Sequence, residues 1–248
     1  MSVLQSAIPR RRIVLLNPKG GSGKTTLATN LAACYAARGL ATALMDYDPQ
    51  GSSLRWLKLR PANSPGIYGV DAASRPMNVT RSWQLRVPPE TSMVIVDTAA
   101  AIPSAQLAEY TRTADAIVVP VGSSDMDIHA ASRFIADLLL VARVNRREHN
   151  VAVVANRVNA RSVASRKLMR FLDRLSIPVA ATLRATQNYA HASDAGLGIH
   201  EFDEPRFRRD VNQWEPLLDW LERTCRRTAS PGEMGLAFRS RPSEAVGG

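Results

Sequence analysis

The segment Asn17-Pro-Lys-Gly-Gly-Ser-Gly-Lys-Thr-Thr26 decides the fold. It follows a short apolar run at residues 13–16, which we expect to be a strand. It leads into residues 25–38, whose apolar side chains recur at helical spacing. Glycines between a strand and a helix let backbone N–H groups turn inward around phosphate oxygens, and the helix dipole favours an anion at the same place. The segment therefore predicts a phosphate-binding loop.

Each side chain of this loop can be assigned a task. Lys24 would reach the terminal phosphates of a bound nucleotide, and the Thr25 hydroxyl would hold Mg²⁺. The usual phosphate-loop pattern has Gly six residues before the lysine, where this chain has Pro18. The residues predicted to bind nucleotide here are Lys19, Gly20, Gly21, Ser22, Gly23, Lys24, Thr25 and Thr26.

The remaining apolar runs indicate an α/β fold. They do not alternate with polar residues, which is typical of strands buried on both faces of a parallel sheet. Helical stretches separate them, so we expect a three-layer sandwich: a mostly parallel central sheet covered by helices on both faces. The predicted strands are residues 41–45, 93–96, 116–119, 151–155 and 177–182, and the predicted later helices are residues 126–146, 164–175 and 212–226.

Polar residues follow several of these strands, at the sheet edge where a ligand is expected. Asp46 and Asp97 end apolar strands, and there a carboxylate can hold Mg²⁺ through water, although an Asp in this position is also a common helix cap or turn residue. Asn156 also follows a strand. It is a candidate for facing the adenine, or an ordinary turn former.

The positive charge of the chain is concentrated in one stretch. The formal net charge is +10, and residues 143–184 hold ten basic residues and only two acidic ones. In a helical projection of residues 164–175, Arg166, Lys167, Arg170 and Arg174 lie opposite the apolar face, as a basic stripe. Such a stripe predicts attraction to a polyanion, or else a solvated face.

The order of the motifs resembles that of the ParA/MinD family of ATPases, closest to the short ParA partition proteins. Lys19-Gly-Gly-Ser-Gly-Lys-Thr25 is similar to the family's deviant Walker A motif, in which a signature lysine stands at the position of Lys19. Leu44-Met-Asp-Tyr-Asp-Pro-Gln-Gly-Ser52 resembles switch I, and Val94-Ile-Val-Asp-Thr98 resembles Walker B and switch II. The segment Pro120-Val-Gly-Ser-Ser-Asp-Met-Asp-Ile-His-Ala-Ala131 resembles a segment near the family's dimer interface.

The resemblance implies a mechanism for the cluster. Lys19 would cross to the nucleotide of a second copy in an ATP-sandwiched homodimer, and Asp48 would orient the attacking water. Two departures stand out. Ala99 and Ala100 replace the family's prolines after Walker B, so we expect a less constrained switch II. Of the family's late Pro-Arg-Asn turn, Arg184 alone carries over.

Three functions fit such an ATPase. The first is ATP-dependent binding to nonspecific DNA, released by hydrolysis, that segregates or positions a cargo with a ParB-like or cargo-adaptor partner. The residues predicted to contact DNA phosphates are Arg161, Arg166, Lys167, Arg170 and Arg184, with Arg206, Arg208 and Arg209 as possible additions. The second is MinD-like membrane cycling through an amphipathic helix at residues 212–226, whose acidic residues and polar continuation make docking onto the sheet the preferred interpretation.

The third is a metal-cluster carrier or another enzyme on the same fold, which the composition disfavours. Cluster carriers need paired cysteines, whereas Cys34 and Cys225 are far apart, and the related tyrosine kinases need a tyrosine cluster beyond Tyr189. We expect a cytoplasmic, nucleoid-associated protein with no signal peptide and no upstream helix-turn-helix domain. The expected domains are a flexible segment 1–11, one ATPase domain 12–226 and a flexible tail 227–248.

Overall fold

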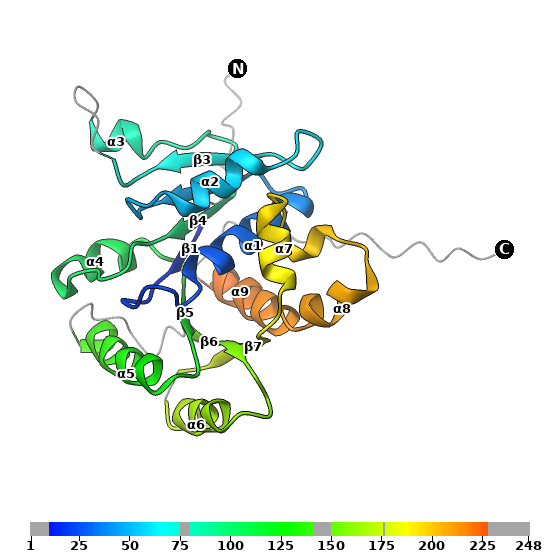
Figure 1. Cartoon of the computed structure of the whole chain (residues 1–248). Coiled ribbons are helices and arrows are strands. Elements are labelled where there is room, and N and C mark those ends of the chain that lie inside the picture. The colour runs from blue at the N-terminus through cyan, green and yellow to red at the C-terminus, as the bar shows by residue number, and fades with distance from the viewer. Residues whose placement is uncertain (1–9, 75–79, 141–149, 176, 228–248) are drawn as a thin grey trace, which may run out of the picture.

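A computed structural model describes residues 10–74, 80–140, 150–175 and 177–227 (Figure 1). Its centre is a seven-stranded sheet in the order β3-β2-β4-β1-β5-β6-β7, and every neighbouring pair runs parallel. The strands are β1 (Arg11–Leu15), β2 (Thr42–Asp46), β3 (Ile67–Asp71), β4 (Met93–Asp97), β5 (Ala116–Val121), β6 (Val151–Val158) and β7 (Val179–Arg184). The predicted parallel sheet is confirmed.

Helices cover both faces of this sheet, as predicted (Figure 1). The α-helices are α1 (Lys24–Ala37), α2 (Ser52–Leu59), α3 (Arg81–Gln84), α4 (Ser104–Thr111), α5 (Asp125–Leu140), α6 (Val163–Leu172), α7 (Asn188–Asp194), α8 (Pro205–Asn212) and α9 (Glu215–Arg227). A 3₁₀ turn, η2 (Ile199–Glu201), joins α7 to α8.

Two hydrophobic cores lie on opposite faces of the sheet because successive side chains of a strand point in opposite directions. On β1, Ile13 and Leu15 pack with α1 and α9, whereas Val14 packs with α5 and α6 on the other side. Both faces of the central strands are therefore buried, which accounts for their continuous apolar sequence.

The last helix docks onto the sheet, as preferred from the sequence. Helix α9 contacts β7 and β5, and Leu217 and Leu221 on its apolar side are fully buried. Trp214, just before the helix, is also fully buried, and its indole N–H donates to the Tyr189 hydroxyl (2.9 Å). The apolar stripe proposed for a membrane anchor is thus part of the core. Within the described ranges, no helix is long and apolar enough to cross a membrane.

Some predictions concern residues outside the described ranges. The end of the predicted helix 126–146 belongs to this group, as do Arg143, Arg146 and Arg147 of the basic segment 143–184, and residues 1–9 and 228–248. Strand β3 was missed from the sequence because it is a half-exposed edge strand, with a glycine at its centre.

Candidate nucleotide site

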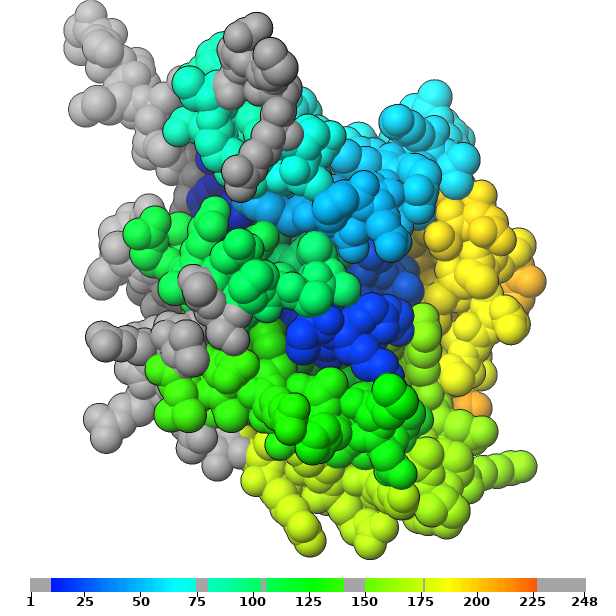
Figure 2. Space-filling view, turned by 60° about the vertical axis from the view of Figure 1, so that its left-hand side comes forward, coloured from blue at the N-terminus to red at the C-terminus, as the bar shows by residue number. Residues whose placement is uncertain are grey.

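The phosphate loop leaves β1 and enters α1 at the carboxyl edge of the sheet. Gly21 and Gly23 take the left-handed backbone conformation, with φ angles of 72° and 101°, and α1 begins at Lys24. Gly20 and Gly21 are exposed, and the loop forms part of the molecular surface between the green helices α4 and α5 and the cyan segment around α2 (Figure 2). An anion can therefore approach the backbone N–H groups from solvent.

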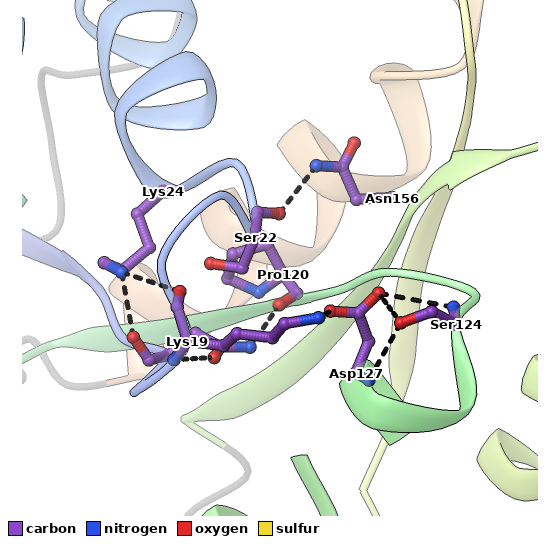
Figure 3. Close-up of polar contacts among 8 residues, drawn as sticks. Lys19, Ser22, Lys24, Pro120, Ser124, Asp127 and Asn156 are labelled. Carbon is purple, nitrogen blue, oxygen red and sulfur yellow. Dashed lines mark hydrogen bonds and ion pairs between the residues drawn. The ribbon is translucent and has the colours of Figure 1, made fainter. Parts of the chain in front are cut away.

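Gly23 is required for a second reason, which involves Asn156. A Cβ atom on Gly23 would lie 2.1 Å from the Asn156 side-chain nitrogen, which donates a hydrogen bond to the Ser22 carbonyl (2.9 Å; Figure 3). The other amide atom, Oδ1, accepts from the Arg157 N–H (3.0 Å). Asn156 thus anchors the loop through the Ser22 carbonyl. This contact favours a structural role over the adenine contact predicted for it.

Lys24 is buried within the loop that it serves. Its ammonium donates to the carbonyl oxygens of Asn17 (2.9 Å) and Lys19 (3.3 Å), and its side chain comes from the first residue of α1 (Figure 3). Burial lowers the pKa of this amine, and the nearby carboxylates of Asp97 and Asp48 oppose that shift. In this structure the ammonium is held by carbonyl oxygens of the loop itself, so its predicted contact with phosphate stays a prediction.

Asp97 is a buried carboxyl that lies near the Thr25 and Ser53 hydroxyls and the Lys24 ammonium. It ends β4, is fully buried, and neither of its side-chain oxygens has a hydrogen-bond partner among the described residues. Burial raises the pKa of this carboxyl to about 7, and Asp46 adds to the shift. The Thr25 and Ser53 hydroxyls and the Lys24 charge oppose it. A buried carboxyl without partners is costly unless a ligand compensates it.

Asp46, predicted as a second metal ligand, has other partners. One oxygen accepts from the Asp48 N–H (3.0 Å), and the other accepts from the N–H groups of Ser53 (3.1 Å) and Leu54 (3.2 Å) at the start of α2. Its carboxylate therefore caps α2 and closes the turn of switch I. This favours the cap role that the sequence left open beside metal binding.

Switch II is tied to the phosphate loop. The Ala101 N–H donates to the Pro18 carbonyl (2.8 Å), and the Thr98 hydroxyl donates to the Leu15 carbonyl (2.7 Å). Ala101 has a φ angle of 56°, which is strained for a residue with a Cβ. Ala99 and Ala100 are therefore followed directly by a residue that is hydrogen-bonded to the phosphate loop. Switch II is more constrained here than the two alanines led us to expect.

These residues suit a magnesium–nucleotide complex. The backbone N–H groups and Lys24 offer a cradle for phosphates, while Asp97 supplies two uncompensated oxygens beside the Thr25 hydroxyl. Mg²⁺ takes oxygen ligands, commonly one or two carboxylates with phosphates and water. The donor set fits the group.

Comparisons with known proteins show which family the chain belongs to. Residues 13–199 match the model of the CobQ/CobB/MinD/ParA nucleotide binding domain. The chain belongs to this family.

Two relatives and one solved structure illustrate the likeness. Maintenance of carboxysome distribution protein A from Gloeobacter kilaueensis is 32% identical over 219 residues, covering 88% of this chain and 96% of the relative. Chromosome-partitioning ATPase Soj from Thermus thermophilus is 50% identical over 58 residues, covering 23% and 22%. A structure of McdA from Cyanothece with ATP superposes with a TM-score of 0.60 at 15% identity, covering 84% and 96%.

The predicted DNA ligands of this family member fall into two groups. Leu168 and Leu172 of α6 are buried, whereas the basic stripe of Arg166, Lys167, Arg170 and Arg174 is exposed, which confirms the amphipathic helix. Arg161 is exposed just before α6, and Lys167 forms an ion pair with Asp125 of α5 (3.0 Å).

Arg184 lies apart from the stripe, at the end of β7. Its guanidinium donates two hydrogen bonds to the fully buried Asp210, one to Oδ1 (2.5 Å) and one to Oδ2 (3.0 Å). This pairing favours a structural role over the DNA contact predicted from the sequence, because the guanidinium already neutralises a buried carboxylate.

Sequence reasoning missed Asp127, which forms an ion pair with Lys19 (Figure 3). It also missed Asn17, whose side-chain amide donates to the Pro120 carbonyl (2.6 Å) and whose Oδ1 accepts from the Lys19 N–H (2.8 Å). The spacing Ser124-x-x-Asp127 at a helix start was the available signal for Asp127. No local sequence pattern predicts the hydrogen bond between Asn17 and Pro120, which lie 103 residues apart.

Proposed function

We propose that this protein is a ParA-type, Mg²⁺-dependent ATPase that forms an ATP-sandwich dimer, binds nonspecific DNA in that state and positions a cargo. The observation that carries the ATPase part is Asp97, fully buried without hydrogen-bond partners among the described residues, beside a left-handed glycine loop and a buried lysine.

The side chains divide the work of phosphoryl transfer, which is mostly positioning and charge neutralisation. Lys24 and the loop N–H groups hold the phosphates, while Thr25 and Asp97 hold the metal ion. Mg²⁺ supplies charge neutralisation at the phosphate oxygens when it is bound. Asp48 of switch I orients the attacking water, and Lys19 reaches the nucleotide of a second copy.

Several features of the loop's face support dimer formation. Gly20 and Gly21 are exposed there, and Met126 at the start of α5 is 74% exposed. Met126 also lines a cavity of about 700 Å³, to which Pro18, Ile102, Leu107 and Phe134 contribute apolar lining and Asp125, Arg133 and Asp137 contribute charged groups. An apolar surface around a nucleotide loop suits a dimer that encloses the nucleotide.

DNA binding rests on the basic stripe and Arg161. Exposed arginines displace condensed counterions from DNA phosphates, which gives affinity that ignores sequence and falls with salt. The +10 net charge adds long-range attraction to any polyanion. In this proposal the protein acts in the cytoplasm on the nucleoid.

The names of two relatives support the proposed kind of cargo. One relative is named for carboxysome distribution and another for chromosome partitioning, so the cargo is a protein body or a DNA region. A ParB-like protein or cargo adaptor stimulates an otherwise slow hydrolysis. Membrane cycling is the weaker alternative, because Leu217 and Leu221 of α9 would have to leave the core.

The test combines phosphate release with nucleotide binding. We expect Mg²⁺-dependent ATP hydrolysis by the full chain, loss of nucleotide binding in Lys24→Ala, and an ATP-trapped dimer in Asp48→Ala. Lys58→Ala, at an exposed position on α2, serves as the control. A Lys24→Ala protein that binds ATP as the parent does would refute the assigned site.

A further inference from the structure

The ammonium of Lys19 has a partner within its own chain. It forms an ion pair with Asp127 Oδ1, joining the phosphate loop to the first turn of α5, 108 residues away (Figure 3). The Lys19 side chain is 32% exposed and that of Asp127 is 18% exposed. The lysine with the proposed intersubunit role is therefore engaged in cis.

Asp127 is itself held in place by Ser124. Its Oδ2 accepts hydrogen bonds from the Ser124 hydroxyl (2.6 Å) and N–H (3.2 Å), and its own N–H donates to the Ser124 hydroxyl oxygen (3.1 Å). This reciprocal capping box anchors one carboxylate oxygen to the helix start and leaves the other for Lys19. The carboxylate has a fixed direction even if the lysine leaves.

Two further observations indicate that the pairing is built in. A Cβ on Gly122 would lie 2.5 Å from Asp127 Oδ2, so a side chain there would displace the carboxylate. Burial raises the pKa of Asp127, but hydrogen bonds from Lys19 and Ser124 outweigh it and the pKa is lowered overall. The carboxylate stays charged at neutral pH.

We propose that Asp127 is a positioning residue that holds Lys19 in cis in the single chain. Lys19 must then exchange Asp127 for the phosphates bound to a second copy when the dimer forms. Asp127 thereby raises the nucleotide occupancy needed for dimerisation and disfavours dimers without nucleotide. This inference rests on the proposed intersubunit role of Lys19.

Loss of the Lys19–Asp127 ion pair should have a small effect within one chain and a larger effect on the dissociation constant of the dimer. A partly exposed ion pair contributes little, but a symmetric dimer breaks two of them, so their effects on the dissociation constant multiply. We expect Asp127→Asn to tighten the nucleotide-bound dimer by roughly tenfold.

The experiment measures the dimer dissociation constant by sedimentation equilibrium of the full chain, with Mg²⁺ and AMPPNP. Asp127→Asn keeps an oxygen for the cap, and Asp127→Ser is the second variant if the first folds poorly. Asp125→Asn is the matched control, because it removes the same charge from the same helix turn without touching Lys19. Ser124→Ala tests the cap alone.

The proposal predicts a tighter dimer for Asp127→Asn, a smaller tightening for Ser124→Ala, an unchanged dimer for Asp125→Asn, and no effect of Asp127→Asn in a Lys19→Gln background. Equal tightening by Asp125→Asn, or a weaker dimer for Asp127→Asn, would overturn it. If Lys19→Gln abolishes the dimer while Asp127→Asn changes nothing, the cis pairing fails and the proposed function stands. If Lys19→Gln dimerises normally, the intersubunit role itself fails.

Discussion

At the scale of single residues, Asp97 and Asp46 show how two similar carboxylates serve different ends. Both end neighbouring parallel strands and are paired in register on β2 and β4. Asp46 accepts three backbone N–H groups, whereas Asp97 has no hydrogen-bond partner among the described residues. From the sequence the two were alike, because the difference depends on how the chain turns after each strand.

The raised pKa of Asp97 predicts how stability depends on pH. A carboxyl with a pKa of about 7 in the folded state and an ordinary value of 3.8 when unfolded binds its proton more tightly in the folded state. Stability without nucleotide therefore falls as pH rises from about 4 to about 7. Asp97→Asn mimics the neutral acid, so at pH 5, where only part of the fall has occurred, it should be more stable than the parent by only about 1–2 kcal/mol.

At pH 8 the same variant should be more stable than the parent by about 2–4 kcal/mol. Urea unfolding at both pH values without metal or nucleotide measures the difference, and Asp173→Asn, at an exposed position after α6, is the control. An Asp97→Asn effect that is the same at pH 5 and pH 8 would contradict the raised pKa.

At the scale of elements, the start of α2 depends on Asp46. Removing a buried carboxylate that accepts three N–H groups leaves those donors without partners, so we expect Asp46→Ala to destabilise the metal-free protein by about 2–4 kcal/mol. Asp46→Asn, which retains one acceptor oxygen, should lose less. Chemical denaturation in chelator measures both variants. Unchanged stability there would mean that Asp46 serves the metal alone.

The elements themselves were predicted to different degrees. The central strands and α1 follow from continuous apolar runs around a glycine loop, because burial on both faces leaves a clear sequence signal. Edge strand β3 and the short helices α3 and α7 carry little apolar periodicity. Long-range pairs such as Arg60 with Glu201 (2.6 Å) depend on tertiary packing and have no local signal.

At the scale of the whole molecule, the burial of α9 distinguishes an ATPase that binds DNA from one that cycles on a membrane. Trp214, Leu217 and Leu221 are all fully buried against the sheet, so inserting them into lipid would expose one of the two cores. We expect no ATP-dependent binding to anionic liposomes in a flotation assay at physiological salt. Nucleotide-dependent flotation would instead support the membrane-cycling alternative.

The distribution of charge gives the matching expectation for DNA. Arg166 and Arg170 lie on the exposed side of α6, whereas Arg38, just after α1, and Lys58, on α2, are exposed elsewhere on the molecule. Replacing either pair with alanine removes the same charge, so the comparison separates a local contact surface from general attraction. Each lost phosphate contact should reduce the slope of log affinity against log salt by about 0.9.

The most direct measurement is binding of the full chain to nonspecific duplex DNA with ATP, with ADP and without nucleotide, at several salt concentrations. We expect salt-sensitive binding with ATP alone, and a greater loss of affinity and slope for Arg166→Ala with Arg170→Ala than for Arg38→Ala with Lys58→Ala. Binding that ignores the nucleotide, or equal losses for the two pairs, would contradict an ATP-switched interface on α6.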